Sequence, residues 1–137
     1  MSSTISQEII ELNFPDLSSV IVIGGAYLEL LGVRSAGDID LAVSKINWEY
    51  LRNDLGWSVH TKGESLYMRD PAGRFDAWRG WYDREHQRII EFDELLKNSL
   101  VHHQGFRVPT VEYQIQLKRW DGRQKDLEDI ALLERIA

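Results

Sequence analysis

The sequence predicts an α/β (α+β) fold: a small mixed β-sheet with helices packed behind it and two helices at the C-terminus. Four consecutive β-branched residues at 20–23 are suited to a buried strand. A second strand is predicted over 38–43, where residues 38–41 alternate polar and apolar side chains. Residues 111–120 and 123–136 have helical periodicity. We expect one domain over residues 1–137, because this length supports one hydrophobic core.

The rest of the chain supplies further short elements. We expect an N-terminal helix over 6–13, capped by Ser6, and a helix over 47–55 that Gly56 ends. Strands are predicted at 57–60, 65–69 and 74–78, a helix at 92–98, and a small hairpin from 100–103 and 106–108. The polar stretch 80–88 is expected to be a loop. Thr110 is expected to cap the first C-terminal helix, which ends at Asp121-Gly122.

Composition limits the classes of function. The chain has no cysteine, which excludes disulfides and cysteine-bound zinc and is typical of a cytoplasmic protein. No apolar run is long enough to span a membrane, and the first 19 residues lack the pattern of a signal peptide. The net charge of −6 argues against broad, non-specific nucleic-acid binding, which depends on neutralising phosphates.

Residues 20–44 contain the strongest functional pattern. The strand at 20–23 stops at Gly24-Gly25, and residues 26–31 follow with helical character. A glycine turn at a helix N-terminus can present backbone N–H groups to a phosphate. Asp38 and Asp40 lie two residues apart on the next strand, so both face one side of the sheet. Paired carboxylates bind Mg²⁺, which usually also contacts substrate phosphates, so the pattern indicates a metal–nucleotide site.

Each half of this pattern has a simpler explanation when taken alone. Gly24-Gly25 can be an ordinary tight turn, and Asp38-Ile39-Asp40 can be an exposed edge strand. A dinucleotide-binding turn is excluded, because the residues after Gly24 do not form the Gly-x-Gly-x-x-Gly pattern. The two halves together, in this order, favour the metal–nucleotide site.

Gly24-Gly25 followed after twelve residues by Asp38-Ile39-Asp40 resembles the motif of the polymerase-β-like nucleotidyltransferases, especially the small, minimal members. The resemblance implies that the glycine turn holds a triphosphate and that the two aspartates hold two magnesium ions. It also implies a third carboxylate on a neighbouring strand, for which Asp76 is the candidate. Asp76 could instead face solvent or pair with Arg74 or Arg79, but an aspartate is disfavoured inside a strand unless it has a role there.

A second element of the resemblance lies at 118–130. Lys118, a short gap and Arg-x-Lys-Asp-x-x-Asp lead into the last helix, and in the family this lysine reaches toward the nucleotide phosphates. Alone, such a charged run would be a solvated helix face. We expect Asp126 and Asp129 to be structural, pairing with Arg123 or capping the helix. Arg34 and Ser35 are weaker candidates for nucleotide binding, and Ser35 stands where many relatives have threonine.

The resemblance implies magnesium-dependent transfer of a nucleotide monophosphate from an NTP to an acceptor. Asp38, Asp40 and Asp76 would be the catalytic metal ligands, and Gly24, Gly25, Arg34, Ser35 and Lys118 the nucleotide-binding residues. The acceptor could be a protein, a tRNA end or a small molecule. A partner protein, as in toxin–antitoxin pairs, could supply further surface. Two alternatives stay open: a nucleotide- or partner-binding domain without catalysis, and a metal-dependent phosphohydrolase or nuclease.

Overall fold

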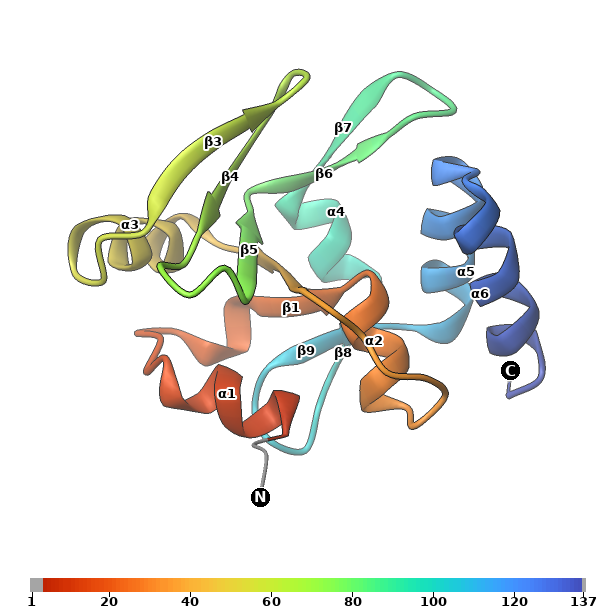
Figure 1. The fold of residues 1–137 in the computed structure, drawn as a ribbon, viewed down its shortest axis with the longest axis horizontal. Coiled ribbons are helices and arrows are strands. Elements are labelled where there is room, and N and C mark those ends of the chain that lie inside the picture. The colour runs from red at the N-terminus through yellow and green to blue at the C-terminus, as the bar shows by residue number, and fades with distance from the viewer. Residues whose placement is uncertain (1–3, 137) are drawn as a thin grey trace.

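A seven-stranded mixed sheet forms the centre of the computed structural model, which describes residues 4–136 (Figure 1). Its strands are β1 (Val20–Ile23), β2 (Ile39–Val43), β3 (Ser58–Lys62), β4 (Ser65–Arg69), β5 (Phe75–Trp78), β8 (Ser99–Val101) and β9 (Arg107–Pro109). They are arranged in the order β3-β4-β5-β2-β1-β9-β8. The β2–β5 and β1–β9 pairs are parallel and the other pairs are antiparallel. The predicted mixed sheet is confirmed.

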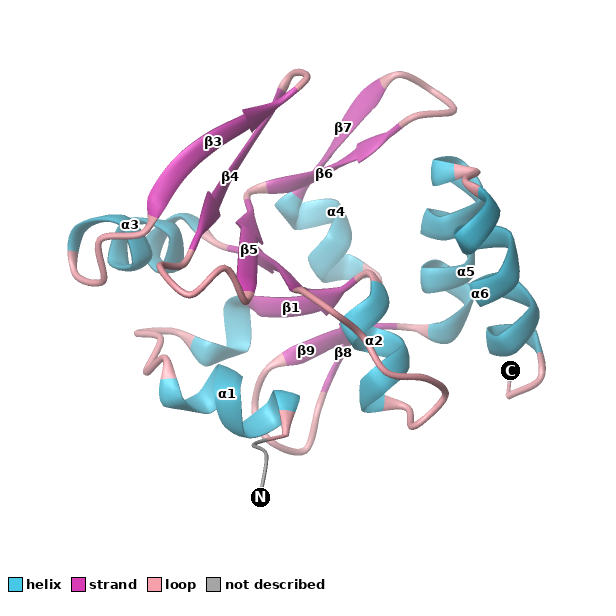
Figure 2. Cartoon of the chain, in the orientation of Figure 1, coloured by secondary structure: helices cyan, strands magenta, loops and turns pink. Residues whose placement is uncertain are grey.

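Helices surround this sheet, as the secondary-structure view shows (Figure 2). They are α1 (Ile5–Glu11), α2 (Gly25–Leu30), α3 (Lys45–Asn53), α4 (Phe92–Lys97), α5 (Val111–Asp121) and α6 (Gln124–Glu134), with a 3₁₀ turn at Leu17–Ser19. The antiparallel pair α5–α6 stands at one side of the sheet (Figure 1). The two predicted C-terminal helices are therefore confirmed. None of the helices within residues 4–136 is both long and apolar enough to cross a membrane.

The two faces of the sheet belong to different cores. Ile39 and Leu41 of β2 pack in a cluster that includes residues of α1 and α3. Ala42, on the opposite face, packs in a second cluster with residues of α4 and α5. Because side chains alternate along a strand, Asp40 shares the face of Ala42. The alternation thus directs Asp40 toward the side of the sheet where α5 lies.

The stretch 80–88 is not a loop, so that prediction is wrong. Strands β6 (Gly80–Asp83) and β7 (Arg88–Glu91) form a separate two-stranded sheet. Asp83 is fully buried and holds the turn, since its carboxylate accepts hydrogen bonds from His86 and Arg88. Gly80 permits the pairing, because a Cβ there would lie 2.5 Å from the carbonyl oxygen of Ile90. The sequence suggested a loop because its charged residues, which bond to one another inside the turn, look like solvated residues.

Helix caps were predicted with mixed success. Thr4, not Ser6, caps α1: its hydroxyl accepts from the backbone N–H of Gln7, whose side chain accepts from the backbone of Thr4. Thr110 caps α5, as predicted. Gly122 ends α5 with φ +64°, a left-handed conformation that glycine adopts without strain.

Candidate active site

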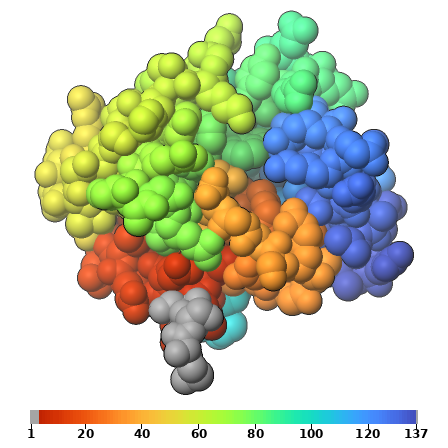
Figure 3. Space-filling view, viewed as in Figure 1, coloured from red at the N-terminus to blue at the C-terminus, as the bar shows by residue number. Residues whose placement is uncertain are grey.

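A cavity of about 720 Å³ opens between the sheet and the C-terminal helices. The space-filling view shows the surface hollowed where the β3–β4 hairpin, α2 and α5 approach one another (Figure 3). Its charged lining residues are Arg34, Lys62, Arg69, Arg84, Lys118, Arg123 and Lys125 with Asp38, Asp40, Asp76, Asp121 and Asp129. Seven of the chain's 16 basic residues line it, but only five of its 22 acidic ones. The cavity therefore concentrates positive charge in an acidic protein.

The cavity brings together most of the residues that the sequence singled out. Asp38, Asp40, Asp76, Gly24, Gly25, Arg34 and Lys118 all line it. Ser35 is exposed and is not a lining residue; its backbone carbonyl accepts a hydrogen bond from Arg34. Residues separated by almost a hundred positions in sequence thus face one space.

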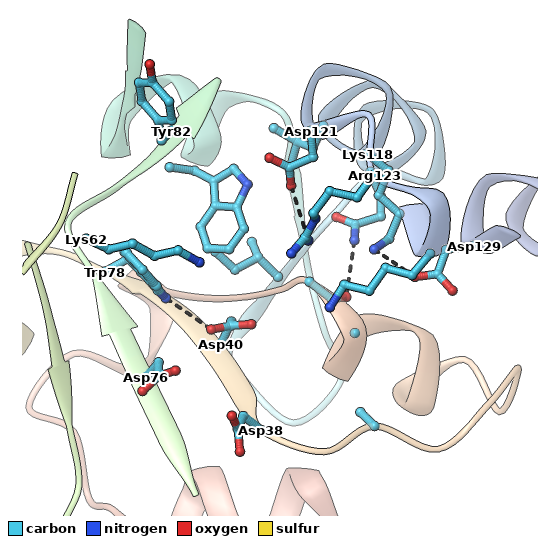
Figure 4. Close-up of a pocket in the computed structure, with 18 of the residues that line it drawn as sticks. Asp38, Asp40, Lys62, Asp76, Trp78, Tyr82, Lys118, Asp121, Arg123 and Asp129 are labelled. Atoms are coloured by element: carbon cyan, nitrogen blue, oxygen red, sulfur yellow. Dashed lines mark hydrogen bonds and ion pairs between the residues drawn. The ribbon is translucent and has the colours of Figure 1, made fainter. Parts of the chain in front are cut away.

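The three aspartates and their neighbours form one side of the cavity, which we call the sheet wall (Asp38, Asp40, Arg69, Asp76 and Trp78). Asp40 of β2 and Asp76 of β5 are direct partners in the parallel pair, so their backbones lie about 4.8 Å apart. Trp78 Nε1 donates a hydrogen bond of 3.1 Å to Asp40 Oδ1 (Figure 4). Asp38 lies nearby, just before β2 begins (Figure 4).

The surroundings of the Asp40 carboxyl disfavour its ionised form. The pKa of Asp40 is raised to about 6, mainly by burial and also by the charges of Asp76 and Asp38, while the Trp78 hydrogen bond and Lys125 oppose the rise. The cause is general: removal from water and nearby like charges both disfavour a carboxylate. A cation placed among these carboxylates would stabilise the ionised form of Asp40.

Arg69 already supplies part of that positive charge. Its Nε and Nη2 donate to both oxygens of Asp76, at 2.8 and 3.0 Å, and Nη2 also lies 3.8 Å from Asp38 Oδ2. Sequence reasoning considered Arg74 or Arg79 as a partner of Asp76, but Arg74 pairs with Glu8 and the partner is Arg69. Within residues 4–136 no three His, Asp or Glu side chains are gathered closely enough to hold a metal ion together. An ion at Asp76 would have to replace Arg69.

The glycine turn lies directly against the sheet wall. Gly24 has φ +66°, and a Cβ at this position would lie 3.0 Å from Asp40 Oδ2. A Cβ at Gly25 would lie 3.4 Å from the Arg34 guanidinium. Both glycines therefore let the backbone approach charged groups of the cavity closely.

The opposite side of the cavity, the helix wall, is a network of ion pairs (Arg34, Lys118, Asp121, Arg123, Asp126 and Asp129). Arg34 donates two hydrogen bonds of 2.8 Å to Asp129, and Lys118 Nζ lies 3.0 Å from the same carboxylate. The Asp126 carboxylate accepts hydrogen bonds from the backbone N–H and the guanidinium of Arg123 at the start of α6, so the predicted pairing with Arg123 is confirmed. Asp129 is structural too, but it pairs with Arg34 and Lys118 rather than with Arg123.

Pairing sets the charge state of Asp129. Desolvation would raise the pKa of this carboxyl, but hydrogen bonds from Arg34 and Lys118 outweigh it and hold the pKa below its usual range. Lys118 itself is only 5% exposed. The lysine predicted to reach phosphates therefore lines the cavity while it is held by two carboxylates, Asp129 and, at 3.6 Å, Asp126.

Sequence reasoning missed several lining residues that simple periodicity would have found. Trp78 is two residues after Asp76 on the same strand, so it shares a face with it. Gln114 precedes Lys118 by one helical turn and faces the same cavity. Arg69 had no signal in the sequence, because its position depends on the register of β4 against β5, in which Arg69 is the direct partner of Asp76.

Comparison with known proteins identifies the fold. No family model matches the chain, and no curated protein matches its sequence. Among solved structures, it is similar to a Thermotoga maritima protein described as a "putative nucleotidyltransferase", with a TM-score of 0.61 and 14% identity over 96% of this chain and 91% of that one. The chain therefore has a nucleotidyltransferase-like fold.

Proposed function

We propose that the protein is a metal-dependent nucleotidyltransferase, which transfers an NMP from an NTP to an acceptor and releases pyrophosphate. One observation carries the proposal: a carboxylate pair, Asp40 and Asp76, shares one cavity with a glycine turn and seven basic side chains. A triphosphate is bound by cations and by backbone groups that can approach it closely, and the metal that accompanies it is bound by carboxylates. The similarity in fold to the Thermotoga maritima protein and the resemblance of the motifs support the same assignment.

The ligand chemistry of the sheet wall suits Mg²⁺, but its three carboxylates do not converge on one point while Arg69 occupies Asp76. Asp38, Asp40 and Asp76 offer hard carboxylate oxygens, and the pKa of Asp40 is raised first by burial and then by the charges of Asp76 and Asp38. These three residues would hold up to two ions, with Asp76 beside the acceptor after Arg69 withdraws. Bound there, the metal would stabilise charge on the phosphoryl oxygens and favour ionisation of the attacking hydroxyl.

The chain's own residues would position the nucleotide. Gly24 and Gly25 have no side chain, so their backbone can approach the phosphates closely. Lys118, and more weakly Arg34, would contribute positive charge to the phosphates. Trp78 keeps Asp40 oriented through its Nε1 hydrogen bond. The acceptor would be a protein, a tRNA end or a small molecule, and a partner protein of the toxin–antitoxin kind would extend the acceptor surface.

A second candidate function, nucleotide binding without transfer, is favoured by one specific observation. Arg69 holds both oxygens of Asp76, which is the position of the third carboxylate. If this pair persists when nucleotide is bound, only Asp38 and Asp40 are left for a metal. Binding would then need a single ion, and transfer would not occur.

Isothermal titration of ATP with and without Mg²⁺ tests the proposal. We expect Mg²⁺-dependent binding that is lost in an Asp38→Asn, Asp40→Asn double variant. A Glu49→Gln, Glu128→Gln double variant, which removes two exposed carboxylates outside the cavity, should bind normally. Equal affinity with and without Mg²⁺ would contradict the proposal.

Incubation with labelled NTP, Mg²⁺ and cell extract separates the candidate reactions. A labelled macromolecule or small molecule indicates transfer. Free NMP indicates hydrolysis, and unchanged NTP in the presence of normal binding indicates binding alone.

A further inference from the structure

One buried polar atom of the cavity lacks a partner. Gln114 Oε1 is the single buried side-chain oxygen or nitrogen within residues 4–136 that makes no hydrogen bond. Gln114 is 1% exposed and lines the cavity beside Gly24 and Lys118. Buried acceptors without a donor are rare and destabilising, because the group has lost its hydrogen bonds to water.

The orientation of the Gln114 amide follows from its other contact. Nε2 donates a hydrogen bond of 3.2 Å to the carbonyl oxygen of Gly24. A carbonyl oxygen only accepts, so the nitrogen must face Gly24 and the oxygen must face away from it. Exchanging the two atoms would place two acceptors against each other. No donor within residues 4–136 reaches Oε1, so a group bound in the cavity that Gln114 lines would have to supply one.

The chemistry of an NTP restricts which group could be that donor. Phosphate oxygens are acceptors at neutral pH, so the triphosphate cannot satisfy Oε1. Its donors are the sugar hydroxyls and, for some bases, an amino group. Gln114 is hydrogen-bonded to the glycine turn proposed to hold the phosphates, and the sugar is the part of a nucleotide attached directly to them. A sugar hydroxyl is therefore the donor nearest to Oε1.

We infer that Gln114 is a specificity-determining residue that accepts a hydrogen bond from a sugar hydroxyl of the bound nucleotide. This inference rests on the proposed function and adds a substrate requirement to it: a nucleotide whose sugar carries the hydroxyl that pairs with Oε1. A site built to pair with a hydroxyl discriminates strongly against an analogue that lacks it, because the site's own polar group is then left unpaired. The base plays no part in this selection.

The test compares ATP with 2′-deoxy-ATP and 3′-deoxy-ATP by isothermal titration in Mg²⁺. We expect one of the two analogues to bind the unmodified protein about tenfold more weakly than ATP, which corresponds to about 1.4 kcal/mol. The analogue that weakens identifies the hydroxyl. Affinities within twofold of each other for all three nucleotides would overturn the inference while leaving the proposed function intact. Absence of Mg²⁺-dependent ATP binding would overturn both.

A Gln114→Leu variant assigns the discrimination to this residue. Leucine has a similar size and no acceptor, and the Gly24 carbonyl still receives the backbone N–H of Tyr27 at 3.3 Å. We expect ATP to bind this variant as weakly as the discriminated analogue, with the difference between them gone. Gln116→Leu, on the same helix but outside the cavity lining, is the matched control and should keep the discrimination. Persistence of the discrimination in folded Gln114→Leu would overturn the assignment. If that variant does not fold, the analogue series on the unmodified protein still decides whether the site pairs with a sugar hydroxyl.

Discussion

The sheet wall and the helix wall face each other across the same cavity, yet they balance charge differently. The sheet wall has three carboxylates and one arginine, and its Asp40 has a pKa raised to about 6. The helix wall has three carboxylates and three cations, and its Asp129 has a lowered pKa. One wall is thus short of positive charge and the other is internally neutralised. The comparison teaches that the same carboxylate is destabilised by its surroundings at Asp40 and stabilised by its partners at Asp129.

Asp129→Asn should produce the largest effect on stability and would break the helix wall. It leaves Arg34 and buried Lys118 without their shared partner, and breaking a buried ion pair is strongly destabilising. Arg34 is partly exposed, so we expect a loss of about 3 kcal/mol at pH 7. Because the Asp129 pKa is lowered in the folded state, this contribution is present above about pH 4 and disappears as pH falls through the folded pKa.

Urea denaturation at several pH values measures the effect of Asp129→Asn. Glu128→Gln, an exposed neighbour on α6, is the control and should change stability little. An Asp129→Asn protein as stable as the parent at pH 7 would show that the helix wall is not held by this network.

Asp76→Asn should come next, with an effect on transfer rather than on binding. Asp38 and Asp40 can still hold the ion that accompanies the triphosphate, so Mg–NTP affinity should be near normal. The ion beside the acceptor would lose a charged ligand, and the rate should fall roughly a hundred-fold or more, about 2.7 kcal/mol. Labelled transfer in extract and titration of ATP measure the two quantities. Normal turnover would remove Asp76 from the metal site, and unfolding would make it a structural partner of Arg69.

Asp40→Asn should have a smaller effect on stability and the opposite sign to Asp129→Asn. A raised pKa means that ionised Asp40 destabilises the folded state, so stability is lost as pH rises from the usual value of 3.8 through about 6. The asparagine variant avoids this loss and still accepts from Trp78. We expect a gain of about 1–2 kcal/mol at pH 7.5 in EDTA, which vanishes near pH 4.

Adding Mg²⁺ sharpens this test. A bound cation would stabilise ionised Asp40 in the parent protein. The gain in stability from Asp40→Asn should therefore be smaller in Mg²⁺ than in EDTA. Thermal unfolding with EDTA and with Mg²⁺ gives the comparison. A destabilised Asp40→Asn protein in EDTA would show that the sheet wall tolerates its charge.

Arg69→Gln should have the smallest effect. Removal of the guanidinium frees Asp76 and leaves the sheet wall with no cation, so a divalent ion should bind it more tightly without nucleotide. We expect a gain of roughly three- to fivefold in Mn²⁺ affinity, measured by electron paramagnetic resonance of free Mn²⁺. Arg79→Gln, an exposed arginine outside the cavity lining, is the control. Unchanged affinity would mean that Arg69 does not compete with the metal.

The sequence was most informative where periodicity and turns act locally. The Gly24 turn, the strand that carries Asp40 and the Thr110 cap depend on neighbouring residues, and each was predicted. The β6–β7 hairpin was missed because its polar turn looks like a solvated loop in the sequence. In the structure, buried Asp83 accepts the hydrogen bonds of that turn. Long-range partners could not be predicted: Arg69 meets Asp76 only through strand register, and Arg34 meets Asp129 only after the sheet and α6 have come together.

From the bond between Arg34 and Asp129 we expect assembly of the cavity to be a late event in folding. The bond joins residues 95 positions apart, from the loop before β2 to the last helix. Closing so long a loop has an entropic penalty that local contacts do not have. The sheet wall can therefore form from nearby strands, whereas the helix wall forms only when α6 packs in place. Loosening of α6 would release Arg34 and Lys118 together, so hydrogen exchange in this helix should report on how completely the nucleotide pocket is formed.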